Sequence, residues 1–184
     1  MRLYLIRHPQ PLVAAGICYG SSDLAVAPEE RARVLAGCLP VLPPGLRLYS
    51  SPLRRCAELA VDIAAALDVP LTYDARLAEM HFGDWEMRAW DAIARAEIDA
   101  WVADGADYRP GGGESVVQMA RRVCAFVEEL RQLEQDALLI CHAGTIKMLK
   151  AWRPGISLRE MALGAVEARQ KIEYGGLIVI KEFG

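Results

Sequence analysis

The chain has 184 residues, of which 53% are hydrophobic and 24% are charged, and its formal net charge at pH 7 is -3. These values predict one globular domain over residues 1–184 with an ample core, and they exclude a disordered chain. The small negative charge excludes a general basic surface for nucleic acid. An anionic ligand would therefore need a locally positive pocket.

The order of apolar segments along the chain predicts alternating strands and helices. Residues 3–6 and 137–141 are short, nearly continuous apolar runs next to a histidine, as expected of central strands buried on both faces. Residues 52–67 and 114–133 carry apolar side chains at helical spacing. In chain order we predict a strand at 3–6, a helix at 28–39, a strand at 46–49, a helix at 52–67, a strand at 69–73, a helix at 114–133, a strand at 137–141, a helix at 143–152 and a strand at 177–180. The alternation predicts a three-layer α/β domain.

Residues 84–112 do not fit this alternation. They are rich in Trp, Ala and Asp, and glycines and Pro110 break their second half. We expect a small helical cap or insertion here and not a separate domain. Its aromatic residues are expected either to line a cap over an aromatic base or to pack in the core: Trp85, Trp90, Trp101 and Tyr108.

The cysteines and the first apolar run bear on the cellular compartment. The five cysteines are odd in number, scattered and without a C-x-x-C pair, which favours reduced thiols in a cytoplasmic protein. Arg7 and His8 interrupt the first apolar run, so no secretion signal is expected. No apolar stretch is long enough to span a bilayer, and we expect no membrane partner.

Polar side chains follow three of the predicted strands. In open α/β sheets ligands bind beyond the carboxyl ends of the strands, so these side chains are expected to meet there. The helix that follows His142 would add backbone N–H groups from Gly144 and Thr145, and an anion pocket of phosphate size would result. Glu79, in a loop-like stretch, could supply a carboxyl group at its rim. The residues after the strands are Arg7 and His8, then Ser50 and Ser51 leading to Arg54 and Arg55, and finally His142.

Residue types alone leave other interpretations open. A histidine at a strand end is often only a surface or hydrogen-bonded residue, and the arginines and Glu79 could be solvated charges. A thiolate chemistry is a further alternative, because "CHAGTIK" places Cys141 six residues before Lys147, much as cysteine phosphatases place Cys before Arg. Lysine lacks the planar bidentate grip of arginine, which weighs against this alternative.

Five segments, in this order, resemble the histidine phosphatase superfamily. They are "LYLIRH", "SSPLRRCAELA", "LAEMHFGDWE", "GGES" and "LLICHAG", and together they cover nearly the whole chain. The resemblance implies the phosphoglycerate mutase-like fold, a three-layer α/β/α sandwich around a mostly parallel central sheet. By spacing, the second arginine of the family falls on Arg55 and not on Arg54.

The resemblance also implies a role for each site residue. His8 would be the nucleophile that forms a phosphohistidine, with a backbone carbonyl holding its other ring nitrogen. Arg7, Arg55 and His142 would bind the phosphate oxygens, and Glu79 would protonate the leaving oxygen. No metal ion and no cofactor are expected.

The chain departs from the family pattern after the Arg-His pair. Pro9 stands where a glycine is usual, and Gln10 and Pro11 replace Glu-Thr, so a backbone N–H contact at Pro9 is lost. The asparagine that often follows is absent, and Ser21 or Ser22 could replace it. His81 has no assigned role; contact with the leaving group and packing near Trp85 are both open to it.

Within the superfamily, "CYGSSDL" and "EMHFGDWE" most resemble the α-ribazole phosphatases of cobalamin assembly. The resemblance implies a small phosphorylated substrate such as α-ribazole 5′-phosphate or adenosylcobalamin 5′-phosphate, and no nucleic-acid partner. A broad-specificity phosphatase, a phosphoglycerate mutase and a non-catalytic module that binds a phosphorylated ligand are the alternatives. The chain is short for a mutase. The sequence does not determine the oligomeric state.

Overall fold

A five-stranded sheet forms the centre of the protein, whose computed structural model describes residues 1–183. The strands lie in the order β3-β2-β4-β1-β5, and all neighbours are parallel except β5, which pairs antiparallel with β1. The predicted mostly parallel sheet is therefore confirmed. The strands are β1 (Leu3–Arg7), β2 (Arg47–Ser50), β3 (Leu71–Tyr73), β4 (Ala137–Cys141) and β5 (Leu177–Ile180).

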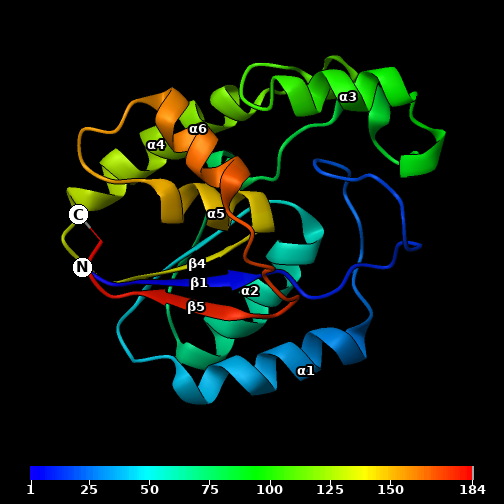
Figure 1. Ribbon diagram of the computed structural model, residues 1–184. Helices are drawn as coiled ribbons and strands as arrows, with labels where there is room; N and C mark the ends of the chain where they lie inside the picture. Colours follow the sequence, from blue (N-terminus) through cyan, green and yellow to red (C-terminus); the bar gives the residue numbers. More distant parts are fainter. Residues whose placement is uncertain (184) are drawn as a thin grey trace.

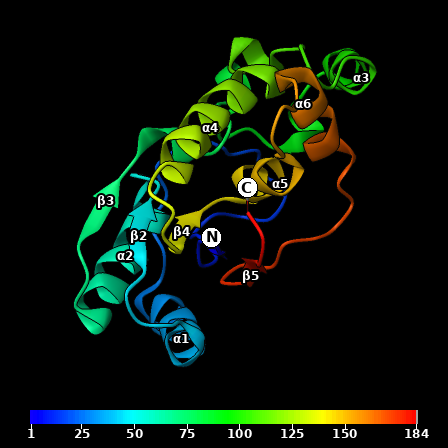
Figure 2. The same ribbon diagram turned by 90° about the vertical axis from the view of Figure 1, so that its left-hand side faces the viewer.

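Helices cover both faces of this sheet, as Figures 1 and 2 show. The side chains of β1 alternate between two cores: Leu3 and Leu5 pack with the α4–α6 side, whereas Tyr4 and Ile6 pack with the α1–α2 side. This is the predicted three-layer arrangement. One face carries α1 (Pro28–Cys38) and α2 (Arg54–Leu67), and the other carries α4 (Val116–Arg131), α5 (Ala143–Ala151) and α6 (Leu158–Glu167). No helix within the described residues is long and apolar enough to cross a membrane.

The register of the central strands brings the predicted strand-end residues together. Arg7 pairs with Cys141 in the parallel β1–β4 ladder, and Ser50 pairs with Ile140 in the β2–β4 ladder. The chain continues these ladders for one residue, because the N–H of His8 donates to the Cys141 carbonyl at 3.0 Å. Three chain segments thus leave the same edge of the sheet side by side.

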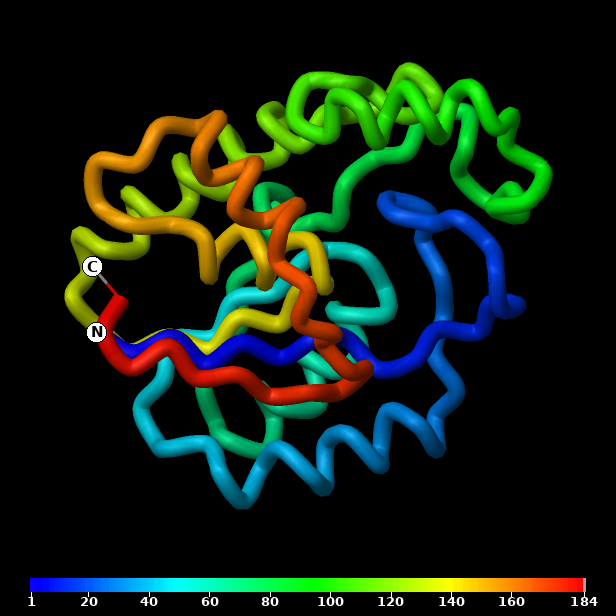
Figure 3. The backbone as a smooth tube through the Cα atoms, viewed as in Figure 1, coloured from blue at the N-terminus to red at the C-terminus, as the bar shows by residue number. Residues whose placement is uncertain are grey.

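The sequence-based prediction missed one helix, α6. Ser157 is its N-cap, and the Ser157 and Glu160 side chains form a reciprocal capping box that marks its start. A second capping box, between the side chains of Ser115 and Gln118, sets the start of α4, which is why this helix begins later than the predicted residue 114. Figure 3 shows that the chain after α6 runs from that helix back to the end of β1 before entering β5.

The segment at 84–112 contains α3 (Arg95–Ala103) and short 3₁₀ turns. Trp85 is its anchor: the ring is fully buried with Cys18 and Ile93, and its indole N–H donates to Glu97 at 2.7 Å. The loop around Cys18 pairs with residues 86–90, since the Cys18 N–H donates to Arg88 and its carbonyl accepts from Met87. The loop around Cys18 and the segment at 84–112 are therefore packed against each other.

Candidate active site

His8 lies directly after β1 and is only 2% exposed. Its Nδ1 is 2.8 Å from the carbonyl oxygen of Pro9, which accepts but cannot donate, so the proton resides on Nδ1 and Nε2 keeps its lone pair. Burial and then the charge of Arg55 lower the pKa of His8 to about 3, against the Pro9 bond, which raises it. The expected carbonyl partner is confirmed, and it is supplied by Pro9, the residue that departs from the family pattern.

His142 lies beside His8 at the end of β4, with 5.1 Å between the ring centroids. It is fully buried, and burial followed by the repulsion from His8 and Arg55 lowers its pKa well below the ordinary value. Its Nε2 is 2.8 Å from the hydroxyl oxygen of Ser51, the residue that follows β2. Both rings are therefore neutral at physiological pH.

Arg55 is 1% exposed and occupies the first turn of α2, whereas Arg54 is exposed and pairs with Glu58. The arginine that the motif spacing selects is thus the buried one of the two. The Arg55 guanidinium donates to the carbonyls of Ser22, at 2.6 Å, and Gly20. Its Nε–H is buried and finds no acceptor among the described residues.

Arg7 is held on the other side of His8 by the segment before β5. Its guanidinium carbon lies 3.7 Å from the ring centroid of Tyr174, and its Nη1 donates to the Ile172 carbonyl at 2.6 Å. The Arg7 Nε–H is likewise buried without an acceptor within residues 1–183. Buried donors are almost always paired in proteins, so two unpaired guanidinium N–H groups near one imidazole fit an anionic ligand.

Glu79 lies in an irregular segment between β3 and the insertion. Its Oε2 accepts from the backbone N–H of Gly144 and its Oε1 from that of Met80, both at 3.0 Å. The predicted use of the Gly144 N–H as a phosphate donor is therefore wrong, because the carboxylate of Glu79 already occupies it. The start of α5 positions an acidic group instead.

A cavity of about 660 Å³ adjoins this site through Glu79, Tyr19 and Tyr174. Lys147 of α5 also lines the cavity. The remaining wall is mainly apolar and includes Val13, Ile17, Met80, Phe82, Trp90, Trp101, Val116, Met119 and Met148.

Two of the four aromatic residues predicted for the cap reach this cavity. The rings of Trp90 and Trp101 are parallel to within 3°, with centroids 6.2 Å apart, and Phe82 meets both edge-on. Trp85 and Tyr108 are not among the residues that line the cavity, because Trp85 is buried in the insertion's own core and Tyr108 packs against that core.

Several other sequence-based expectations need correction. His81 is exposed and accepts a bond from the Gly83 N–H at 3.1 Å, so it does not pack in the core around Trp85; it lies outside the 660 Å³ cavity and lines a second pocket together with Glu79. Ser21 and Ser22 bind the carboxylate of Glu86. Cys141 is fully buried, and burial raises the pKa of its thiol well above the ordinary value, which removes the support for a thiolate nucleophile.

The sequence did not indicate several residues that organise the site. Tyr174 stands 166 residues from His8, and only the fold brings their rings to 5.6 Å. Glu86 accepts backbone bonds from Gly20, Ser21, Ser22 and Phe82, and so shapes the loop whose carbonyls bind Arg55. Glu86 lies in the quoted "FGDWE" stretch, yet nothing in that stretch distinguishes it from a solvated acid.

Comparison with known proteins identifies the family. The model of the histidine phosphatase superfamily (branch 1) matches residues 3–170. A glucosyl-3-phosphoglycerate phosphatase from Mycolicibacterium vanbaalenii is 34% identical over 165 residues, which cover 82% of this chain and 72% of that protein. An adenosylcobalamin/α-ribazole phosphatase from Salmonella typhimurium is 30% identical over 159 residues, covering 82% of this chain and 78% of that protein. The crystal structure of the α-ribazole phosphatase from Shigella flexneri matches with a TM-score of 0.80 at 26% identity, covering 98% of this chain and 90% of that one. The chain belongs to the histidine phosphatase superfamily, and like these relatives it is a phosphatase.

Proposed function

We propose that this phosphatase hydrolyses a phosphomonoester through a phosphohistidine on His8. The lone pair of Nε2 attacks phosphorus, the bond to the ester oxygen breaks, and protonated Glu79 gives its proton to the departing oxygen. Glu79 then takes a proton from water, the oxygen of that water attacks phosphorus, and the P–N bond breaks to release phosphate and neutral His8. The low pKa of His8 and its Nδ1 bond to Pro9 support this role.

The arginines and His142 are proposed to bind the phosphoryl oxygens. Arg7 and Arg55 each keep a buried Nε–H without an acceptor in the described chain, and both lower the pKa of His8 through their charge. An anion between them would satisfy these donors and balance that charge as it shifts during transfer. No step in this scheme requires a metal ion, so activity is expected to survive chelation.

For the substrate we propose α-ribazole 5′-phosphate or its cobalamin conjugate, adenosylcobalamin 5′-phosphate. One observation carries this proposal: the cavity beside Glu79 is walled mainly by apolar and aromatic side chains, with Trp90, Trp101 and Phe82 among them. The benzimidazole ring of α-ribazole is flat and apolar and suits such a wall, whereas a leaving group without an aromatic ring, such as a glucosylglycerate or serine, would place polar groups against it. In this proposal residues 84–112 form the cap of a single catalytic domain. The thiols of all five cysteines are free, which supports a cytoplasmic enzyme.

A second candidate follows from Lys147. This side chain lines the same cavity, and no ion-pair partner is present for it within residues 1–183. A cation in that position would bind the carboxylate of a phosphoglycerate-type substrate, and the relative from Mycolicibacterium vanbaalenii is named for a substrate of this type.

A panel of phosphomonoesters tests these proposals. It contains α-ribazole 5′-phosphate, adenosylcobalamin 5′-phosphate, glucosyl-3-phosphoglycerate and 3-phosphoglycerate, each assayed in the presence of a chelator. The α-ribazole esters should give the highest kcat/KM, and a phosphoglycerate-type ester in that position would favour the second candidate. His8→Ala should abolish turnover, whereas Cys141→Ser should retain most of it, and the trapped phosphoenzyme should be acid-labile. A requirement for a divalent metal ion would contradict the mechanism.

A further inference from the structure

The backbone that carries Glu79 is held by side chains and not by the sheet. Residues 76–79 lie beyond β3, where no neighbouring strand donates to their carbonyl groups, and unpaired buried carbonyls are costly. Donors from two helices meet this need. Thr145 of α5 donates to the carbonyls of Leu77 and Ala78 at 3.1 and 3.3 Å. The second donor is Arg122 of α4.

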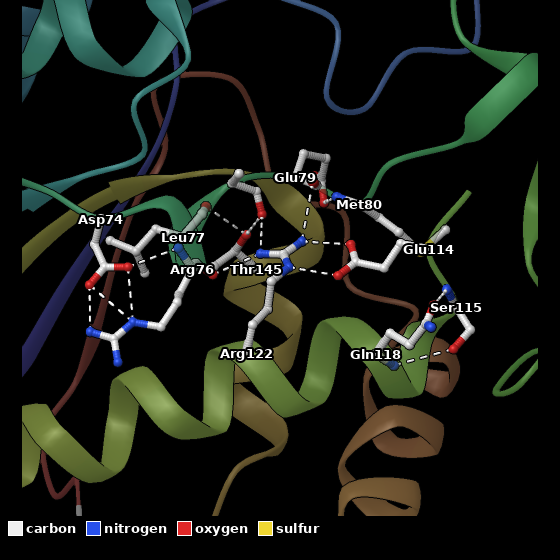
Figure 4. A network of polar contacts seen from close by, with 11 residues as sticks. Asp74, Arg76, Leu77, Glu79, Met80, Glu114, Ser115, Gln118, Arg122 and Thr145 are labelled. Atoms are coloured by element: carbon white, nitrogen blue, oxygen red, sulfur yellow. Dashed lines mark hydrogen bonds and ion pairs between the residues drawn. The ribbon is translucent and has the colours of Figure 1, made fainter.

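Arg122 bridges three carbonyls of this segment. Its Nη1 donates to Arg76 and Ala78, both at 2.7 Å, and its Nη2 donates to Glu79 at 3.2 Å. Figure 4 shows the guanidinium lying between this segment and the start of α4. One planar group with five donors can make such a set of contacts, and a lysine ammonium cannot.

Glu114 orients the guanidinium from the opposite side. Its carboxylate accepts from Nε and Nη2 of Arg122 at 2.7 and 2.8 Å, a bidentate pair between two side chains that are each about four-fifths buried. Glu114 precedes the Ser115 cap, so its backbone is fixed to the start of α4. The Glu114–Arg122 pair therefore connects the start of α4 to the Glu79 backbone and holds that backbone in place.

We propose that Arg122 is a positioning residue for Glu79: by fixing the Glu79 backbone it keeps the carboxyl group where it can protonate the leaving oxygen. The inference rests on the proposed role of Glu79 as the proton donor. The backbone carbonyl of Glu79 is only a few bonds from its carboxyl group, which the N–H groups of Gly144 and Met80 then hold in place. A displacement of about 1 Å in such a group is enough to lower a catalytic rate strongly.

The dependence of the rate on the leaving group separates this role from a purely structural one. A nitrophenolate departs without a proton, whereas an alkoxide needs one, so loss of proton donation steepens the dependence of the phosphorylation burst on leaving-group pKa. We would measure this slope with a series of aryl and alkyl phosphates, which does not depend on knowing the natural substrate. The variants are Arg122→Lys, Glu114→Gln, Glu79→Gln and the double variant of Arg122→Lys with Glu79→Gln.

Arg122→Lys should slow the burst with alkyl esters by about 10- to 100-fold, a part of the roughly 10²–10⁴-fold that acid–base catalysis contributes, and should change the nitrophenyl ester far less. Glu114→Gln should act in the same direction more weakly. In the Glu79→Gln background Arg122→Lys should cost nothing more, because the group that it positions is gone. Arg121→Lys is the matched control, since Arg121 is the exposed neighbour on α4 and its replacement should leave the slope unchanged.

Each contrary outcome has a distinct meaning. Equal losses with all esters in Arg122→Lys, together with a lower free energy of unfolding, would make Arg122 a structural contact and overturn the inference. Additive losses in the double variant would overturn it as well. An unchanged slope in Glu79→Gln itself would overturn the proposed role of Glu79, and the inference with it.

Discussion

The carboxylate of Glu79 and the backbone N–H of Gly144 are joined by a hydrogen bond of 3.0 Å. Gly144 lies in the first turn of α5, where backbone N–H groups have no acceptor within the helix and can hold a carboxyl oxygen in place. A Cβ atom added to Gly144 would overlap Oε1 of Glu79. The absence of a side chain at residue 144 thus lets the acidic group approach the helix.

This contact predicts the effect of Gly144→Ala. The added methyl group should displace the Glu79 carboxylate and lower kcat for an alkyl phosphate by about 10²-fold, because proton donation is lost. The helix itself should not suffer, since alanine favours a helix over glycine by about 1 kcal/mol. The measurement is kcat together with the free energy of unfolding in urea.

Gly37→Ala in α1 is the control for this prediction, because a Cβ atom there would meet nothing within 4 Å. It should leave kcat unchanged and should not lower stability. Full activity in Gly144→Ala would mean that the Glu79 carboxylate does not need its bond to α5.

Much of the site could be predicted because it follows from sheet geometry. Parallel strands with buried faces have a strong sequence signal, and their carboxyl ends must meet at one edge, which is why Arg7, His8 and His142 were expected together. The choice of Arg55 over Arg54 came from motif spacing, and its 1% exposure agrees with that choice.

The residues that could not be predicted act through long-range contacts or through the backbone. Tyr174 reaches Arg7 only because the chain returns from α6 to the sheet edge, and α6 itself was not predicted. Arg122 binds carbonyl oxygens, which leave no pattern in the side chains of residues 76–79. The error on Gly144 has the same origin: a helix start predicts an anion, but it does not indicate whether that anion is a substrate or a side chain.

The low pKa of His8 predicts that stability decreases with acidification. Its pKa is about 3 in the folded protein against an ordinary value of 6.5. Between these values the unfolded chain binds a proton that the folded chain does not, so the free energy of unfolding should fall as the pH decreases from 6.5 toward 3. His142, whose pKa is also lowered, contributes in the same direction.

His8→Asn should reduce this dependence, measured as the free energy of unfolding in urea over the same pH range. His81→Asn is the matched control, because His81 is exposed and lies outside the cluster of His8 and His142. A His8→Asn variant that loses stability on acidification as steeply as the wild type would contradict a neutral, buried His8.

Lys147→Met tests which leaving group the cavity accepts. Methionine keeps most of the length of the side chain and removes its charge, so a substrate whose carboxylate binds Lys147 should show a KM raised about tenfold, the equivalent of about 1.4 kcal/mol. The KM for α-ribazole 5′-phosphate should change much less. Lys150→Met, on the exposed side of α5, is the control. A large rise in KM for the α-ribazole ester alone would mean that Lys147 binds that substrate.

The contact between Tyr174 and Arg7 predicts weaker phosphate binding when the ring is removed. The guanidinium lies 3.7 Å from the ring centroid, and a partly buried contact of this kind is worth about 1–2 kcal/mol. Tyr174→Leu should therefore release Arg7 and raise the inhibition constants of inorganic phosphate and vanadate by about tenfold.

Tyr174→Phe keeps the ring and loses only the 2.6 Å bond between the Tyr174 and Tyr19 hydroxyl groups, so its effect should be small. Tyr73→Leu, on the exposed edge of the sheet, controls for the loss of a tyrosine as such. If Tyr174→Phe weakened phosphate binding as much as Tyr174→Leu, the hydroxyl pair would position Arg7 and the stacking contact would contribute little.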